Sequence, residues 1–251
     1  MTKRIYGWTK DTADARDFFL LPDLRTPVPA RVDLRGQCPP VYDQGQLGSC
    51  TANAIAAAHE FDQMKQPGGS TFVPSRLGIY YGERKIEGTV SQDAGAMIRD
   101  GMKVINSEGL ASESLWPYIV AKFAQKPPAA YYAEAAKHQS ILYQRVVPTI
   151  DAIKAALAAG YPVVFGLKVY ASFESQSVAK TGIVPVPKKG EQLLGGHAVC
   201  AVGYDDAKGW LIVLNSWGPG WGDKGYFYFP YANIAACGAS DFWTLTKVEE
   251  A

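Results

Sequence analysis

The sequence lacks any continuous apolar run of 18 residues, and its first residues are followed by charged side chains rather than by a hydrophobic stretch. Neither a membrane-spanning helix nor a secretory signal peptide is therefore expected. An excess of charge of one sign is also missing, since 25 Lys and Arg stand against 24 Asp and Glu, a formal net charge of +1. The sequence thus predicts no nucleic-acid partner and no membrane partner.

Cysteine is scarce as well, with four residues at positions 38, 50, 200 and 237. Their spacing lacks the close pairs of a zinc site, and their number is too small for a disulfide-dense secreted scaffold. The default location is therefore the cytoplasm, with export by a non-standard route left open.

The composition is that of an ordinary folded domain, with 47% hydrophobic and 20% charged residues. The 25 Gly, 16 Pro and many aromatic residues (6 Trp, 14 Tyr and 10 Phe) predict turns and strands and argue against an all-helical protein.

The first 32 residues differ from the rest of the chain. They are rich in Asp, Arg and Pro, show no sustained periodicity and carry one apolar island at residues 18–21. Two interpretations stand side by side: a disordered tail, or a strap whose apolar island docks on the body of the protein.

Helices are expected early in the remaining chain and strands late. The segment that begins at Cys50 is rich in Ala and free of Gly and Pro, which predicts a helix ending near residues 67–69. Further helices are predicted at 93–107, 129–138 and 151–159, and strands at 163–170, 197–204, 210–214 and 225–229. This order indicates an α+β fold of two lobes with a cleft between them. We expect an arm at 1–32 and one domain at 33–251, with a helical lobe at about 33–148 and a β-rich lobe at about 149–246.

Three separate segments supply the parts of a thiol-based catalytic site. Cys50 follows a Gly-containing loop and opens the predicted helix, whose N-terminus favours the thiolate. His197, at a strand start, is a candidate acid and base, and Asn215, at the end of the next strand, can orient its ring. Gln44, six residues before Cys50, is placed to donate a hydrogen bond to an oxyanion.

These segments resemble the papain family of cysteine peptidases, and in particular its short bacterial members. The resemblance spans roughly residues 32–246 and is carried by the loop before Cys50, by Gly196-His197-Ala198-Val199, and by the string that begins at Asn215 and reads Asn-Ser-Trp-Gly-Pro-Gly-Trp-Gly. It implies a papain-like fold and a peptidase that acts on peptides or proteins through a thioacyl-enzyme, without metal or cofactor. The family's double cleft glycine is incomplete in this chain, and Leu47 replaces a cysteine of a common family disulfide.

The resemblance also assigns roles. Gln44, Cys50, His197 and Asn215 become the catalytic residues, and Gly48, Gly95, Gly196 and Trp217 the substrate-binding residues, with Trp217 shaping the side on which the leaving group departs. The arm stands where family members carry inhibitory pro-segments, so it is expected to inhibit. Two alternatives stay open, an acyltransferase or transglutaminase-like enzyme with the same chemistry and a non-catalytic peptide-binding domain. A monomer is the default.

Overall fold

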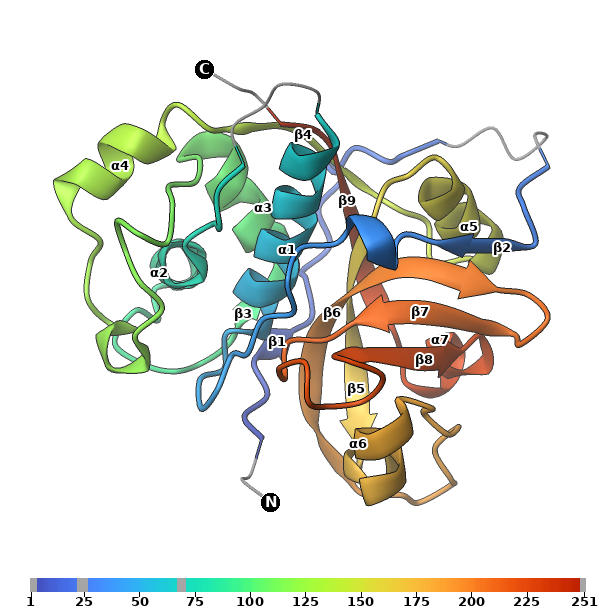
Figure 1. The fold of residues 1–251 in the computed structure, drawn as a ribbon. Helices are drawn as coiled ribbons and strands as arrows, with labels where there is room; N and C mark the ends of the chain where they lie inside the picture. The colour runs from blue at the N-terminus through green and yellow to red at the C-terminus, as the bar shows by residue number, and fades with distance from the viewer. Residues whose placement is uncertain (1–3, 22–26, 67–70, 249–251) are drawn as a thin grey trace.

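The computed structural model describes residues 4–21, 27–66 and 71–248. Its helices and strands separate into a helical part and a sheet, as Figure 1 shows. The helices are α1 (Cys50–Lys65), α2 (Arg76–Glu87), α3 (Ile98–Ser107), α4 (Ala129–Ala135), α5 (Ile150–Ala158), α6 (Gln176–Thr181) and α7 (Ala232–Ala236). Among the described residues, none of these helices combines the length and the apolar character needed to cross a lipid bilayer.

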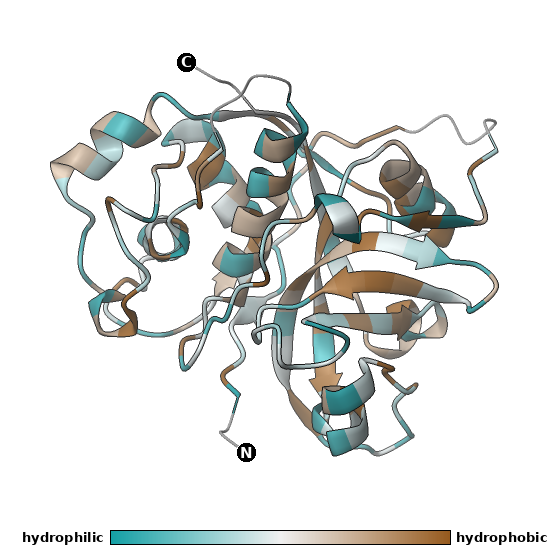
Figure 2. Cartoon of the chain, in the orientation of Figure 1, coloured by the Kyte–Doolittle hydropathy of each residue, from teal (hydrophilic) through white to brown (hydrophobic). Residues whose placement is uncertain are grey.

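The large sheet is antiparallel and is built mostly from the second half of the chain. Its strand order is β4-β9-β5-β6-β7-β8, with β2 paired to β6 as well. The strands are β2 (Arg31–Asp33), β4 (Ser140–Arg145), β5 (Val163–Tyr170), β6 (Leu193–Asp205), β7 (Trp210–Leu214), β8 (Tyr226–Pro230) and β9 (Ser240–Val248). Hydrophobic residues run along β7 in Figure 2, and most residues of β5 and the part of β6 from His197 to Tyr204 are buried.

Helix α1 lies between the helices α2 and α3 and the sheet (Figure 1), and almost all of its residues are buried. Its run of alanines explains this position, because small side chains let neighbouring elements approach from several sides. The helix therefore delivers its first residue, Cys50, to the junction of the two lobes, next to β6.

The beginning of the chain runs along the same junction. Strand β1 (Trp8–Thr9) pairs in parallel with β3 (Ala96–Met97), which directly precedes α3, so this short sheet joins the arm to the helical lobe. Gly95 adopts a φ of +73°, a conformation that favours glycine, and this turn leads into β3.

The predicted two-lobed α+β architecture is thus observed, with differences in detail. Helix α3 begins at Ile98 rather than at residue 93, since residues 96–97 pair with the arm. Helix α2 and strands β4 and β9 were not predicted. The apolar island at residues 18–21 docks on β4 through its backbone, where Phe19 bridges to Arg145, and Leu20 packs against the core, whereas the side chains of Phe18 and Leu21 stay 73% and 84% exposed. The lobe and domain boundaries themselves stay predictions.

Candidate active site

Cys50 is the first residue of α1 and has no exposed surface. The backbone N–H groups of Ala198 and Gly7 approach its sulfur, one from β6 and one from the arm. The sulfur therefore lies beside the strand that carries His197, with the arm covering it.

His197 and Asn215 meet because β6 and β7 are neighbouring antiparallel strands. The ring Nε2 of His197 lies 2.8 Å from Oδ1 of Asn215, which also accepts a bond of 2.9 Å from the backbone N–H of Ser216. Since Oδ1 can only accept, Nε2 carries the proton. The other ring nitrogen, Nδ1, is buried without a hydrogen-bond partner, so it stays available to exchange a proton with a reacting group.

Trp217 covers this pair. Its ring stacks on the His197 ring with centroids 4.9 Å apart and an interplanar angle of 28°, and the residue is 4% exposed. The indole thus keeps water away from the bond between imidazole and amide, which strengthens that bond.

Gln44 is held near the start of α1 by the segment that follows Asn215. Its Oε1 accepts from the Ser216 hydroxyl at 2.7 Å, which leaves the Nε2 group to donate. That group donates to the carbonyl oxygens of Leu47 at 2.9 Å and Ile5 at 3.3 Å. The Ile5 carbonyl of the arm therefore accepts a hydrogen bond from the Gln44 amide, which is the donor predicted to bind an oxyanion.

The thiol and the imidazole are both uncharged in this arrangement. Burial raises the pKa of Cys50 to about 11, against partial compensation by the N–H groups of Ala198 and Gly7. Burial also lowers the pKa of His197 to about 4, although the bond to Asn215 acts in the opposite direction. Burial under the arm thus opposes the thiolate and imidazolium forms that the sequence predicts.

The glycines predicted to bind substrate all contact the arm instead. A Cβ atom on Gly95 would lie 2.1 Å from the carbonyl oxygen of Gly7, and one on Gly196 would lie 2.4 Å from that of Trp8. Gly48 packs against Gly7, since a Cβ on Gly7 would come within 1.7 Å of the Gly48 carbonyl oxygen. The arm thus runs as an extended backbone between glycine-lined walls.

Side chains of the arm fill the cleft on both sides of Cys50. The Trp8 indole lies against Gly166 of β5, where an added Cβ would come within 1.9 Å of the ring. Tyr6 packs edge-on to His197, with ring centroids 6.2 Å apart, and its hydroxyl donates to Glu174. Arg4 lies over the Trp217 ring at 4.8 Å.

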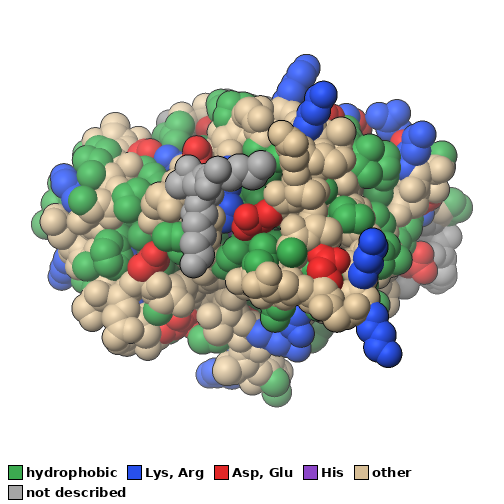
Figure 3. All heavy atoms as spheres, turned by 90° about the horizontal axis from the view of Figure 1, so that it is seen from below, with side chains coloured by type: hydrophobic (Ala, Val, Ile, Leu, Met, Phe, Trp, Pro, Cys, Tyr) green, Lys and Arg blue, Asp and Glu red, His purple; other side chains and the backbone are tan. Residues whose placement is uncertain are grey.

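A cavity of about 460 Å³ opens on the Trp217 side of the cleft. It is lined by Arg4, Asp43, Gly45, Gln46, Glu174, Ala179, Trp217 and Trp221. Figure 3 shows the face at which the start of the chain reaches the surface, and no histidine is visible there outside the part that grey atoms cover.

Sequence reasoning overlooked Ser216, which links Gln44 to the loop after β7, and the arm residues Tyr6, Gly7 and Trp8. Ser216 could have been found as part of the Asn-Ser-Trp string, and Gly7 as a glycine between two aromatic residues. Among the described residues, no group of three or more His, Cys, Asp or Glu side chains is arranged to hold a metal ion.

A thiol at a helix start, beside an imidazole that an amide orients, is typical of enzymes with a cysteine nucleophile. The comparisons agree with this class. The model of the family described as papain family cysteine protease matches residues 28–245. The chain therefore belongs to the papain family of cysteine proteases.

Individual relatives cover most of the chain. A protein of Acanthamoeba polyphaga mimivirus, described as an uncharacterized peptidase C1-like protein, is 44% identical over 274 residues, which cover 98% of this chain and 88% of that protein. Cathepsin K of Gallus gallus is 30% identical over 236 residues, which cover 91% of this chain and 66% of cathepsin K. The crystal structure of xylellain, a cysteine protease from Xylella fastidiosa, superposes with a TM-score of 0.90 and 42% identity over 100% of this chain and 99% of that one. These similarities support the predicted fold and class.

Proposed function

We propose that the protein is a cysteine endopeptidase whose N-terminal arm holds it in an inhibited state. The hydrogen bond between His197 and Asn215, formed beside the Cys50 sulfur, carries the catalytic part of this proposal. The arm backbone between Gly48 and Gly95 carries the inhibitory part.

In the open enzyme, Cys50 transfers its proton to Nδ1 of His197, and the sulfur attacks the carbonyl carbon of the scissile peptide bond. The negative oxygen that forms is stabilised by the Gln44 amide and by backbone N–H groups at the start of α1. His197 then gives its proton to the departing amine as the C–N bond breaks, leaving a thioester on Cys50. Water, deprotonated by His197, attacks this thioester, and the acid is released as the sulfur regains its proton.

The arm lies in the direction opposite to that of a productive substrate. In the mechanism above, the amine half of the substrate departs past His197 and Trp217, so the substrate chain runs from β3 toward Trp217. The arm runs the other way, from Arg4 over Trp217 to Trp8 and Thr9 along β3. It presents the Gly7 N–H to the sulfur. In this orientation the sulfur faces an amide N–H rather than a carbonyl carbon, which supports a bound segment that resists cleavage.

The protonation states support inhibition as well. A neutral thiol is a poor nucleophile, and the arm keeps both Cys50 and His197 free of the water that would stabilise an ion pair. Departure of the arm would expose both groups, lower the thiol pKa and raise the imidazole pKa.

The test combines labelling with turnover. Wild-type chain, Cys50→Ala and a variant lacking residues 1–30 are treated with an epoxide-type thiol inhibitor, and the added mass is located by mass spectrometry. In the wild-type chain we expect one label, on Cys50. The shortened variant should be labelled faster and should hydrolyse the peptide faster than the wild-type chain. Cys50→Ala should show no label at position 50 and no turnover. Turnover that persists in Cys50→Ala would refute the catalytic assignment, and equal rates with and without the arm would refute inhibition. Aminolysis exceeding hydrolysis in the product analysis would indicate an acyltransferase instead.

A further inference from the structure

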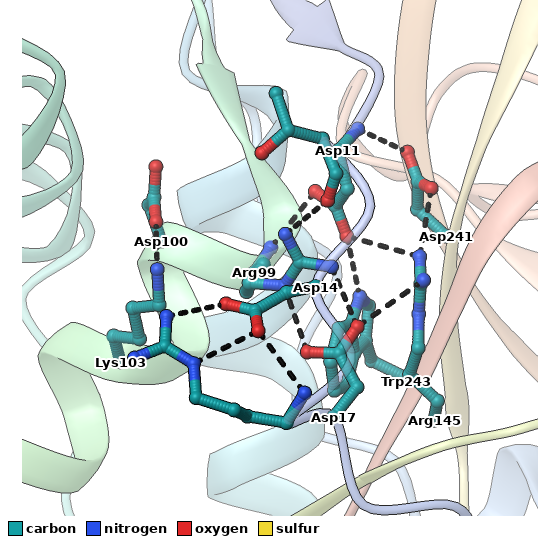
Figure 4. Close-up of polar contacts among 11 residues, drawn as sticks. Asp11, Asp14, Asp17, Arg99, Asp100, Lys103, Arg145, Asp241 and Trp243 are labelled. Atoms are coloured by element: carbon teal, nitrogen blue, oxygen red, sulfur yellow. Dashed lines mark hydrogen bonds and ion pairs between the residues drawn. The ribbon is translucent and has the colours of Figure 1, made fainter.

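A second cluster of arm contacts lies beyond the thiol site, where β9, the end of β4 and the start of α3 come together (Figure 4). Two aspartates of the arm, Asp11 and Asp17, enter it from one side. The body of the protein contributes Arg99 from α3, Arg145 from β4, and Asp241 and Trp243 from β9.

The body surrounds the Asp11 carboxylate with donors. Oδ1 accepts from the backbone N–H of Arg99 at 3.1 Å, and Oδ2 accepts from the Trp243 indole N–H at 2.8 Å and from Arg145 at 3.4 Å. The Asp11 side chain has no exposed surface. A backbone amide, an indole and a guanidinium that converge on one carboxylate form a built binding site, since each group is held by a different element of the fold.

Asp17 is held by the same two arginines. Arg99 donates to its two oxygens through Nε at 2.9 Å and Nη2 at 2.5 Å, and Arg145 lies 3.3 Å away. The Arg99 side chain is only 4% exposed. Such bidentate pairing in a dry setting is among the stronger ionic contacts that proteins make.

Without the arm, this cluster is left with too few negative charges. Asp241 pairs with Arg145 at 3.0 Å, whereas Arg99 pairs with Asp17 of the arm. The neighbouring Asp100 is engaged with Lys103 at 2.9 Å. Two guanidiniums would then face one carboxylate, and the Trp243 N–H would lose its acceptor, so the uncovered cluster would carry a net positive charge and an N–H donor that suit a carboxylate.

The cluster lies within reach of a peptide in the cleft. Gly7 touches the Cys50 sulfur and Asp11 follows four residues later, which corresponds to about 13 Å of extended chain. It is on the β3 side of the sulfur, where the acyl half of a substrate would lie. A cavity of about 290 Å³, lined in part by Arg145, Ser240 and Asp241, opens next to it and leaves room for a side chain.

We propose that Arg99, Arg145 and the Trp243 indole form a carboxylate-binding subsite that, after the arm leaves, recognises an acidic side chain of the peptide substrate about four residues before the scissile bond. This inference rests on the proposed peptidase function, because it describes how that enzyme selects its substrate. The arm holds the subsite closed by supplying its own aspartates.

The experiment uses the full chain with Gly7→Ala, which disfavours the seated arm, and with the double variant Asp11→Ala and Asp17→Ala, which removes the arm's own carboxylates from the subsite. Peptides with a coumarin amide at their C-terminus fix the scissile bond, and they carry Asp or Asn at the third, fourth or fifth residue before it. We expect kcat/KM for the Asp peptide to exceed that for its Asn partner by about tenfold at one of these positions at pH 5 and by less at pH 7, because burial and the Asp241 charge raise the pKa of the Asp11 carboxyl that occupies the subsite to about 6. Equal values at all three positions would overturn the proposal.

Further variants, each added to this background, separate recognition from folding. Arg145→Gln should abolish the preference while hydrolysis of the Asn peptide continues, and Trp243→Phe, which removes one N–H and keeps a ring, should lower it about threefold. Arg31→Gln, whose partners Asp33 and Asp205 lie elsewhere, is the matched control and should keep the preference. A preference that survives Arg145→Gln would contradict the subsite.

Binding provides a readout that does not depend on activity. In the same background with Cys50→Ser, fluorescence anisotropy compares labelled Asp and Asn peptides. Tighter binding of the Asp peptide supports the subsite even if turnover fails, whereas absent turnover with intact binding would count against the peptidase proposal alone. Equal binding of both peptides would overturn the subsite.

Discussion

The arm packs tightly against the body at Gly7, and a single methyl group there tests whether the arm inhibits. A Cβ atom on Gly7 would lie 1.7 Å from the carbonyl oxygen and 2.4 Å from the carbonyl carbon of Gly48. Both are backbone atoms, so no side chain can rotate away, and the arm itself must move. Overpacking of this kind typically costs about 1 to 3 kcal/mol.

In Gly7→Ala that free energy would disfavour the seated arm. The ratio of closed to open enzyme should fall by about 5- to 150-fold, and the initial rate of hydrolysis of a small fluorogenic peptide should rise by a similar factor while the closed form predominates. The matched control is Gly36→Ala, since nothing lies within 4 Å of a Cβ built at Gly36. A rate in Gly7→Ala no higher than in Gly36→Ala would refute the idea that the seated arm blocks the site.

Three further predictions concern the same site. Trp8→Ala should raise peptide turnover about tenfold in initial-rate assays, because the indole no longer fills the slot over Gly166. Gln44→Ala, in the Gly7→Ala background, should lower kcat by about a hundredfold with little change in KM, as steady-state kinetics would reveal; a change in KM alone would argue against an oxyanion role. Docking of the arm should also weaken as pH rises. Asp11 faces Asp241, Arg99 and Arg145, and burial followed by the Asp241 charge raises its pKa from 3.8 to about 6. The docked arm therefore keeps a proton that the free arm gives up, so docking is strongest near pH 4, weakens up to about pH 6 and then levels off. The ratio of wild-type to Asp11→Ala kcat/KM should rise over that interval, and a flat ratio would contradict this reasoning.

The elements that carry the proposed catalytic residues were predictable because these residues lie in short strings whose local structure is simple. Cys50 opens an Ala-rich helix, His197 lies on β6, and Asn215 directly follows β7, so their elements could be placed from sequence. Neighbouring antiparallel strands then bring the imidazole and the amide together.

The missed elements depend on distant contacts. Strand β9 lies between β4 and β5 in the sheet, and β4 pairs with β9. Neither pairing is visible in a local pattern. The start of α3 was misplaced because residues 96–97 pair with β1 of the arm and so form a strand rather than a helix. The arm sequence shows no periodicity that would have predicted β1.

The docking of the arm was only partly predictable for a related reason. The apolar island at residues 18–21 docks on β4, but Gly7 and Trp8, which the sequence does not single out, also seat the arm. The role of Gly7 becomes visible only together with Gly48 and Gly95 on the walls of the cleft. Each of these glycines is separated from the next by more than 40 residues in the sequence. Likewise the aspartates of the arm gain their significance from Arg99 and Arg145, which lie far along the chain.

The reactivity of the Cys50 thiol as a function of pH tests the central claim most directly. The rate of Cys50 alkylation is measured from pH 5 to 9 by intact-mass spectrometry, in the full chain and in the variant lacking residues 1–30. With the arm seated, burial holds the thiol pKa at about 11, so the full chain should react very slowly at pH 7 and faster only toward alkaline pH. The shortened variant should react rapidly already at pH 6 to 7, and superimposable pH profiles for the two proteins would contradict the account.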